Sequence, residues 1–329
     1  MTATRVLVAL GGNAMAAPDG QVRAQDQIAA AQVAMASVAE LVADGLDVVI
    51  THGNGPQVGN LLVKNELAAA VVPPVPLDWC GAQTQATLGF ILMNAVDHAL
   101  QQRGVHRRTA AVVTRALVAL DDPAFAHPTK PIGRYLSRAE AEPLIAHGQQ
   151  FEDRGPRGWR RVVPSPQPEA IIDADVIAAL VDAGFVVVAN GGGGIPVVRE
   201  ADGTLRGVEA VIDKDLGAAL LAGVLHADRL VIATDVDSAM TDYGTPNARP
   251  IGEITVSQLR RLEADGQFAS GSMGPKVDAV CRFVESSGHP AVITSLSNIV
   301  DGVHETSGTS VVPDGGQGTR AIPDHDRTN

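Results

Sequence analysis

Short apolar runs recur along the chain and alternate with stretches of helical periodicity. Runs rich in Val, Leu, Ile and Ala, typical of buried strands, occupy residues 5–10, 46–51, 108–114, 185–189, 230–233 and 291–294, with a short edge strand near 308–309. Helical patterns predict helices at about 26–44, 171–182, 216–223 and 257–265, and the segment 78–85 leads into a further helix that ends at about 102. A turn at Asp202-Gly203 predicts a hairpin. The alternation as a whole predicts an α/β fold with a mostly parallel central sheet.

The alternation stops between residues 121 and 168. This segment holds eight of the 20 prolines and four aromatic residues. We expect an inserted subdomain that protrudes from a single domain spanning residues 1–312, with a polar tail at 313–329. Lys130 lies between two prolines in this insertion, which could act as a lid that carries charge to a site. A structural excursion without such a role is the alternative.

Glycines gather where predicted strands end or helices begin. They lie at Gly11-Gly12, Gly53-Asn54-Gly55, residues 191–194 and residues 271–274. Glycine lets backbone N–H groups approach an anion, and Pro56 suits the first turn of a helix, whose N-terminus attracts negative charge. The second group has the spacing GxGxxxG, one residue longer than the dinucleotide fingerprint, and the expected acidic partner, Asp78, does not end a strand. The pattern therefore favours anion cradles and disfavours NAD binding.

Lysine is rare in this chain, and its positions are unusual. Of the 25 Lys and Arg residues only four are Lys, so arginine supplies the ordinary surface charge. Lys64 lies in a helical stretch and is expected to be exposed. Lys130, Lys214 and Lys276 lie in compact settings rich in Gly, Pro or Asp. Because lysine is a compact, mobile point charge that suits a moving phosphoryl group, we expect these three to take part in chemistry. A surface lysine among surface carboxylates is the alternative for Lys214.

Charge and composition exclude several classes of function. The net charge of −12 and the pI of about 5.1 disfavour nucleic acid or an anionic membrane as a partner. No apolar segment reaches the ~18 residues of a membrane span, and no signal peptide is recognisable, so a cytoplasmic protein is expected. The nine His residues show no metal-ligand spacing, and Cys80 and Cys281 form no CxxC pair.

His52 and Cys80 have open roles. His52 ends a predicted strand, where we expect an orienting or structural role, with a general base as the alternative. Cys80 is either a small packed residue or a reactive thiol, and no feature of the sequence supports a nucleophile there.

Glycine-rich strand ends and isolated lysines together fit phosphoryl transfer, which needs positions for donor and acceptor and cations on the phosphoryl oxygens. Neither a Walker loop nor the protein-kinase motifs are present. The sequence resembles the carbamate kinases of the amino acid kinase family. The matching segments are ALGGNA (9–14), THGNGPQVG (51–59), PTKPIG (128–133), GGGGIPV (191–197), VIDKD (211–215), TDVD (234–237) and GSMGPK (271–276). They follow in order from about residue 5 to residue 312, and the insertion with its Pro-Thr-Lys motif separates carbamate kinases from sibling kinases.

This resemblance implies an αβα sandwich with a mostly parallel sheet, a protruding subdomain and a homodimer. It implies reversible phosphoryl transfer between carbamoyl phosphate and MgADP, giving carbamate and MgATP. Mg²⁺ would be held mainly by phosphate oxygens and water, without a protein metal site.

The resemblance also assigns roles to residues. Lys214 and Lys276 would stabilise the transferring phosphoryl group, Asp215 would orient them, and Lys130 would reach in from the lid. The substrate side would be held by Gly11, Gly12, Asn13, Gly53, Asn54, Gly55, Gly192 and Gly193. The nucleotide side would be lined by Thr234, Asp235, Val236, Asp237, Tyr243, Met273 and Gly274. The residues after Asp237 and the end past Thr309 depart from the family pattern, which affects the nucleotide contacts and the packing of the tail.

Rival interpretations come from two classes. A sibling kinase of the same fold could act on another small acid or phosphonate, which the Pro-Thr-Lys insertion argues against. A non-catalytic ligand-binding relative would be expected to have lost a lysine or a glycine cradle, and the sequence keeps both.

Overall fold

The computed structural model describes residues 3–11, 23–269 and 272–315. Its centre is an eight-stranded sheet in the order β15-β17-β16-β12-β1-β2-β9-β3. The strands are β1 (Arg5–Leu10), β2 (Asp47–His52), β3 (Thr109–Ala111), β9 (Val186–Val188), β12 (Arg229–Thr234), β15 (Glu253–Thr255), β16 (Ala291–Ser295) and β17 (Thr309–Val312). All neighbours are parallel except β16 and β17. The predicted α/β fold with a mostly parallel sheet is confirmed.

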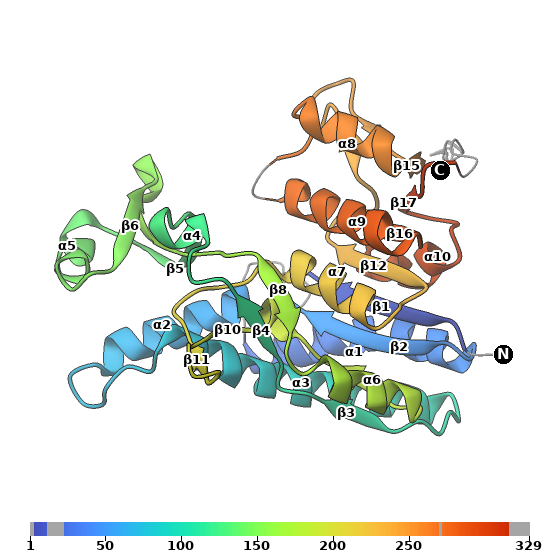
Figure 1. Ribbon diagram of the computed structural model, residues 1–329, viewed down its shortest axis with the longest axis horizontal. Coiled ribbons are helices and arrows are strands. Elements are labelled where there is room, and N and C mark those ends of the chain that lie inside the picture. Colours follow the sequence, from blue (N-terminus) through green and yellow to red (C-terminus); the bar gives the residue numbers. More distant parts are fainter. Residues whose placement is uncertain (1–2, 12–22, 270–271, 316–329) are drawn as a thin grey trace.

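Helices cover both faces of this sheet (Figure 1). One face packs against α1 (Ala24–Ala43), α3 (Leu77–Gln102) and α10 (Ile299–Val303). The other packs against α6 (Ala174–Asp182), α7 (Lys214–Val224), α8 (Val256–Ala264) and α9 (Met273–Ser287). Within β1, Val6 and Val8 belong to the first core and Leu7 and Ala9 to the second. Because successive side chains of a strand point to opposite faces, burial on both faces requires the unbroken apolar runs of the sequence.

Two expected strands differ from the structure. The run at 108–114 forms only the short β3, because the buried Gln85 side chain bonds the backbone of Thr114 in place of a strand neighbour: its Oε1 accepts from the Thr114 N–H at 2.8 Å and its Nε2 donates to the Thr114 carbonyl at 3.0 Å. The strand near 308–309, expected at the edge of the sheet, is β17. It is the second strand of the central sheet, because β15 pairs with it and forms the edge. A run as short as Glu-Ile-Thr carries too little pattern to predict.

A second sheet lies beside the first, in the order β11-β10-β4-β8. It comprises β4 (Arg115–Val118), β8 (Pro168–Ile171), β10 (Ile195–Arg199) and β11 (Leu205–Gly207). The hairpin predicted at Asp202-Gly203 joins β10 to β11. A third pair, β13 (Met240–Thr241) and β14 (Arg249–Pro250), forms a small ribbon.

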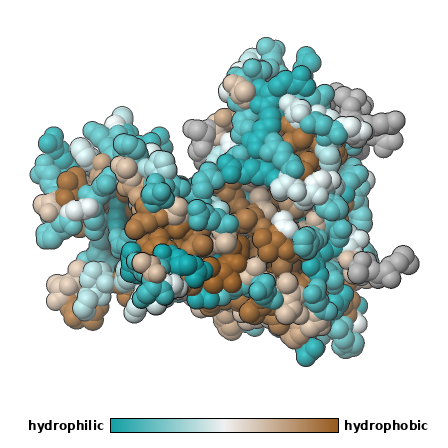
Figure 2. Space-filling model, in the orientation of Figure 1, coloured by the Kyte–Doolittle hydropathy of each residue, from teal (hydrophilic) through white to brown (hydrophobic). Residues whose placement is uncertain are grey.

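The proline-rich segment forms a separate antiparallel sheet in the order β5-β7-β6. Its elements are α4 (Pro123–Ala126), β5 (Lys130–Leu136), α5 (Arg138–Ala146), β6 (Gln150–Asp153), the 3₁₀ turn η2 (Gly155–Arg157) and β7 (Trp159–Val163). We call this part the lid. It projects from the body in Figure 1, and in Figure 2 the molecular outline dips between it and the half that carries α8. Beneath it runs α2 (Gly55–Ala68), which contacts β5.

Candidate active site

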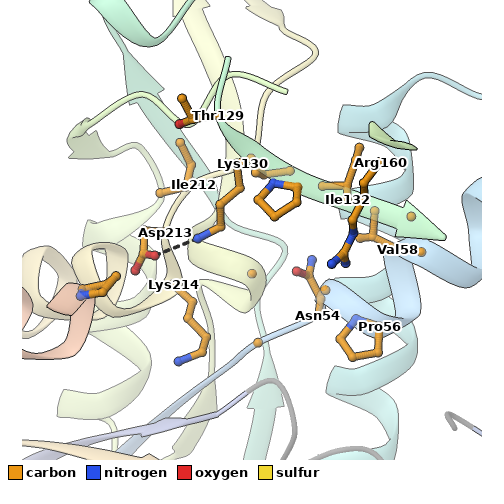
Figure 3. A pocket seen from close by; sticks show the side chains of 18 of the residues that line it. Asn54, Pro56, Val58, Thr129, Lys130, Ile132, Arg160, Ile212, Asp213 and Lys214 are labelled. Atoms are coloured by element: carbon orange, nitrogen blue, oxygen red, sulfur yellow. Dashed lines mark hydrogen bonds and ion pairs between the residues drawn. The ribbon is translucent and has the colours of Figure 1, made fainter. Parts of the chain in front are cut away.

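A cavity of about 1020 Å³ opens between the lid and the carboxyl ends of the central strands. Its walls come from the turn from β2 into α2, the lid, the glycine turn that holds Gly192, the start of α7 and the start of α9. Figure 3 shows Lys130, Lys214, Asn54 and Arg160 around this space. Ligands of open α/β folds bind at this edge of the sheet, where strands end and helices begin.

Two lysines share one buried carboxylate in this cavity. Lys214 is the first residue of α7, and Lys276 lies in the first turn of α9. The Nζ of Lys214 donates to Oδ1 of Asp215 at 2.6 Å, and the Nζ of Lys276 donates to Oδ2 of the same side chain at 3.3 Å. Asp215 is only 2% exposed, and its single carboxylate accepts hydrogen bonds from both lysine side chains.

Burial and neighbouring charges act on the pKa of Lys214 in opposite directions. Burial lowers the pKa of Lys214, and the ammonium of Lys276 lowers it further, while Asp215 acts in the opposite direction; the net effect is a lowered pKa. An anionic ligand beside these two lysines would relieve both the desolvation and the mutual repulsion. The cluster is therefore arranged to receive negative charge.

Asp213 joins the lid to the start of α7. Its Oδ1 caps the helix by accepting from the backbone N–H of Asp215 at 2.9 Å, and its Oδ2 accepts from Lys130 Nζ at 3.0 Å. Burial works to raise the pKa of Asp213, but Lys130 and then Lys214 outweigh it and hold the pKa below its ordinary value. Lys130 is consequently placed over the cavity by the same carboxylate that begins the helix of Lys214 (Figure 3).

Close backbone approach explains the glycines of the cavity wall. Gly53, Asn54 and Gly55 turn from β2 into α2, with Pro56 in the first helical turn. Gly192 has φ +67°, and a Cβ there would stand 2.2 Å from Nδ2 of Asn54. The Asn54 side chain is fixed by a bond from Nδ2 to Oγ1 of Thr84 at 2.9 Å. Only glycine therefore leaves room for Asn54 at the wall of the cavity.

A buried polar layer behind the glycines was not predicted from the sequence. Gln85 Nε2 donates to the carbonyl of Gly191 at 2.9 Å, and the hydroxyl of Thr114 accepts from the N–H of Asn190 at 2.9 Å. His52 is fully buried, and a Cβ on Gly191 would collide with its ring. Burial lowers the pKa of His52 to about 4, so it is neutral at pH 7. The orienting or structural role expected for His52 from the sequence stays a prediction.

The remaining predicted site residues are absent from the cavity lining or fall outside the described residues. The N–H of Gly11 donates to the carbonyl of Ala233 at 2.8 Å, beside Thr234 at the end of β12. Gly193 packs against Ile212. The following residues do not line the cavity: Gly11, Gly193, Thr234, Asp235, Val236, Asp237, Tyr243, Met273 and Gly274. Tyr243 is 71% exposed. Gly12, Asn13 and Gly271 fall outside the described residues.

Sequence reasoning gave no role to four charged residues of the cavity wall. Asp213 was noticed as a neighbour of Lys214 but was given no role, and the lid contributes Arg134, Arg154 and Arg160. The available signal was charge in the proline-rich segment, but arginine is the common cation of this chain and so does not stand out.

The two cysteines are packed residues. Cys80 and Cys281 are both buried. Burial raises the pKa of each thiol, that of Cys281 to about 12, so neither carries a thiolate at neutral pH. Lys64, as expected, is exposed on α2. No helix among the described residues is long and apolar enough to cross a bilayer.

Known proteins resemble the chain over nearly its whole length. The model of the amino acid kinase family matches residues 4–295. A carbamate kinase of Thermococcus kodakarensis is 44% identical over 313 residues, covering 94% of this chain and 99% of the relative. One of Trichomonas vaginalis is 43% identical over 312 residues, with the same coverage. The structure of carbamate kinase from Giardia lamblia bound to AMP-PNP superposes with a TM-score of 0.91 at 40% identity, covering 95% of this chain and 99% of the other. By this sequence match, fold and extent, the chain belongs to the amino acid kinase family, in the group of the carbamate kinases.

Proposed function

We propose that this protein catalyses reversible phosphoryl transfer between carbamoyl phosphate and MgADP, giving carbamate and MgATP. The observation that carries the proposal is the pair Lys214 and Lys276 on the buried Asp215, with Lys130 held across the same cavity by Asp213. The relatives named as carbamate kinases add independent support.

The proposed chemistry is a direct displacement at phosphorus. A β-phosphate oxygen of ADP forms a bond to the phosphorus of carbamoyl phosphate, and the bond from phosphorus to the carbamate oxygen breaks, so that carbamate leaves as an anion. Such transfer depends on alignment and on cations near the phosphoryl oxygens, more than on covalent help from the protein. Lys214 and Lys276 would bind the oxygens of the moving group, Asp215 would keep both lysines in place, and Lys130 would add charge from the lid.

The substrate and nucleotide sides occupy different walls in this proposal. Carbamoyl phosphate would lie against the backbone of Gly53, Asn54, Gly55 and Gly192, which line the cavity. Four further residues would complete that side: Gly11, Gly193, and Gly12 and Asn13, which lie outside the described residues. ADP would lie toward residues 234–237, Tyr243 and the start of α9 at Met273 and Gly274. The relative solved with AMP-PNP supports an adenine nucleotide as the second substrate, and Mg²⁺ would arrive bound to its phosphates.

The proposal also covers the domain organisation and the oligomeric state of the protein. The segment of about residues 121–168 would act as an inserted subdomain on a single domain of residues 1–312, bringing Lys130 to the site. The protein would be a homodimer, as the resemblance implies.

A sibling activity is the second candidate, because one relative at 42% identity over 311 residues is named a carbamate kinase-like protein, in Escherichia coli. The deciding test is ATP formation by purified protein from carbamoyl phosphate, ADP and Mg²⁺. We expect rapid ATP production that depends on Mg²⁺. No ATP from a folded protein that still binds ADP would overturn the proposal in favour of another acceptor.

A further inference from the structure

Three arginines of the lid reach the cavity, and one of them differs in its partners. Arg134 forms ion pairs with Glu66 at 3.3 Å and Glu140 at 3.2 Å. Arg154 forms an ion pair with Glu152. Arg160, on β7, has no carboxylate partner among the residues that the structure describes. In an acidic chain with 37 Asp and Glu residues against 25 Lys and Arg, an uncompensated guanidinium beside a cavity needs an explanation.

The contacts of Arg160 leave its charge available. Its guanidinium lies 5.0 Å from the ring centroid of Tyr135, and one Nη donates to the Tyr135 hydroxyl at 3.4 Å. Its Nε is buried and bonds to no described residue. A buried donor without an acceptor is costly, and the cost is larger for a charged group. The ring holds the side chain in place, and the second Nη, which bonds to no described residue, remains for an acceptor that arrives with the substrate.

The Arg160 side chain lies across the cavity from Lys214 (Figure 3). Figure 3 shows the guanidinium directed toward the side lined by Asn54 and Pro56. That side is the N-terminus of α2, whose free N–H groups also favour an anion. Strand β7 sets this direction because neighbouring side chains alternate: Arg161 lies on its other face, where it pairs with Glu209 at 3.3 Å and lines a second cavity.

We infer that Arg160 binds the carbamate part of the substrate, through its carbonyl oxygen and the oxygen that leaves phosphorus, and is a specificity-determining residue for the acid substrate. The inference rests on the proposed function. In an in-line transfer the nucleotide, the phosphoryl group and the leaving oxygen are roughly collinear. With the phosphoryl group at Lys214 and Lys276 and ADP toward β12, the carbamoyl end faces Arg160. Carbamate is planar, and the planar fork of a guanidinium suits its two oxygens better than a lysine would.

The test compares the wild type with R160Q and R160K in the ATP-forming assay, varying carbamoyl phosphate and ADP separately. We expect the KM for carbamoyl phosphate to rise about 10- to 100-fold in both variants, the cost of losing a charge-assisted hydrogen bond. The KM for ADP is expected to stay within about twofold, because the nucleotide lies on the other side of the transferring group. R160A should regain affinity for carbamoyl phosphate when methylguanidinium is added.

One control separates binding from a role in lid structure. R161Q changes the neighbouring arginine on the opposite face of β7 and should leave the KM for carbamoyl phosphate near the wild-type value. The role of Arg160 is overturned if R160Q leaves the KM for carbamoyl phosphate unchanged. It is also overturned if the KM values for carbamoyl phosphate and ADP rise equally and methylguanidinium does not rescue R160A. In both cases wild-type turnover still upholds the proposed function. Absence of wild-type turnover overturns both.

Discussion

The Nζ of Lys130 lies 3.0 Å from Oδ2 of Asp213, although 83 residues separate them in the chain. The same carboxylate caps α7, which begins at Lys214. One side chain thus fixes the lid lysine and the helix that carries a second lysine of the cavity. The two lysines therefore keep a constant relation to each other whenever this contact is made.

Replacing Asp213 tests this link. Asn is as good an N-cap as Asp, so D213N should keep the stability of α7 while losing the ion pair with Lys130. D213A should lose the cap as well, at a cost of about 1 kcal/mol in the free energy of unfolding. We expect turnover to fall by about tenfold or more in both variants, since each loses a charge-assisted contact. Thermal unfolding and steady-state assays measure the two effects, and normal turnover in D213N would refute the link.

The paired lysines should carry most of the rate enhancement. K214A and K276A each remove a cation that is aimed at the position of the transferring phosphoryl group. We expect turnover to fall by about 10²- to 10³-fold in each, the usual effect of losing one preorganised electrostatic contact. K64A, which changes an exposed lysine of α2, is the matched control and should keep wild-type turnover. Near-normal turnover in both cavity variants, with folding checked by circular dichroism, would contradict the proposed roles.

His52 should make the protein less stable in acid. Its pKa is about 4 when folded, against 6.5 for an unperturbed His. Between these values the unfolded chain binds a proton that the folded protein does not, so stability falls as the pH drops from about 6.5 to about 4. The lowering of the pKa from 6.5 to about 4 corresponds to a loss of about 3 kcal/mol in the free energy of unfolding once the pH is below both values. Urea unfolding at pH 7 and pH 4.5 measures the loss, which should be smaller in H52Q. An identical loss in both proteins would show that other groups cause it.

Gly192 should be irreplaceable for a reason beyond its backbone angle. G192A adds a methyl group that meets the Asn54 side chain, whereas G203A adds one to open space at a similarly positive φ of +86°. Both variants pay for the left-handed backbone, about 1 kcal/mol. Only G192A should also raise the KM for carbamoyl phosphate, because Asn54 must move. Equal kinetics in the two variants would remove Asn54 from the substrate wall.

The apolar pattern along the chain determined most of the fold. Runs such as residues 5–10 and 230–233 are unbroken because both faces of the central sheet are covered, and this burial leaves a direct trace in the sequence. The pattern does not show where a side chain replaces a neighbouring strand as hydrogen-bond partner. The Gln85 side chain does so at Thr114, and for this reason the strand at 108–114 was predicted too long.

For the site, the sequence alone determined which residues were unusual: three lysines in a chain that otherwise uses arginine, and glycines where strands end. Only the tertiary structure decided how they meet. It placed Lys276 and Lys214 on one carboxylate, joined Lys130 to Asp213, and left Arg160 without a carboxylate partner among the described residues. Local patterns record backbone conformation and burial, because these act on neighbours in the chain. Charge pairing between distant segments depends on how the elements pack, and no local pattern encodes it.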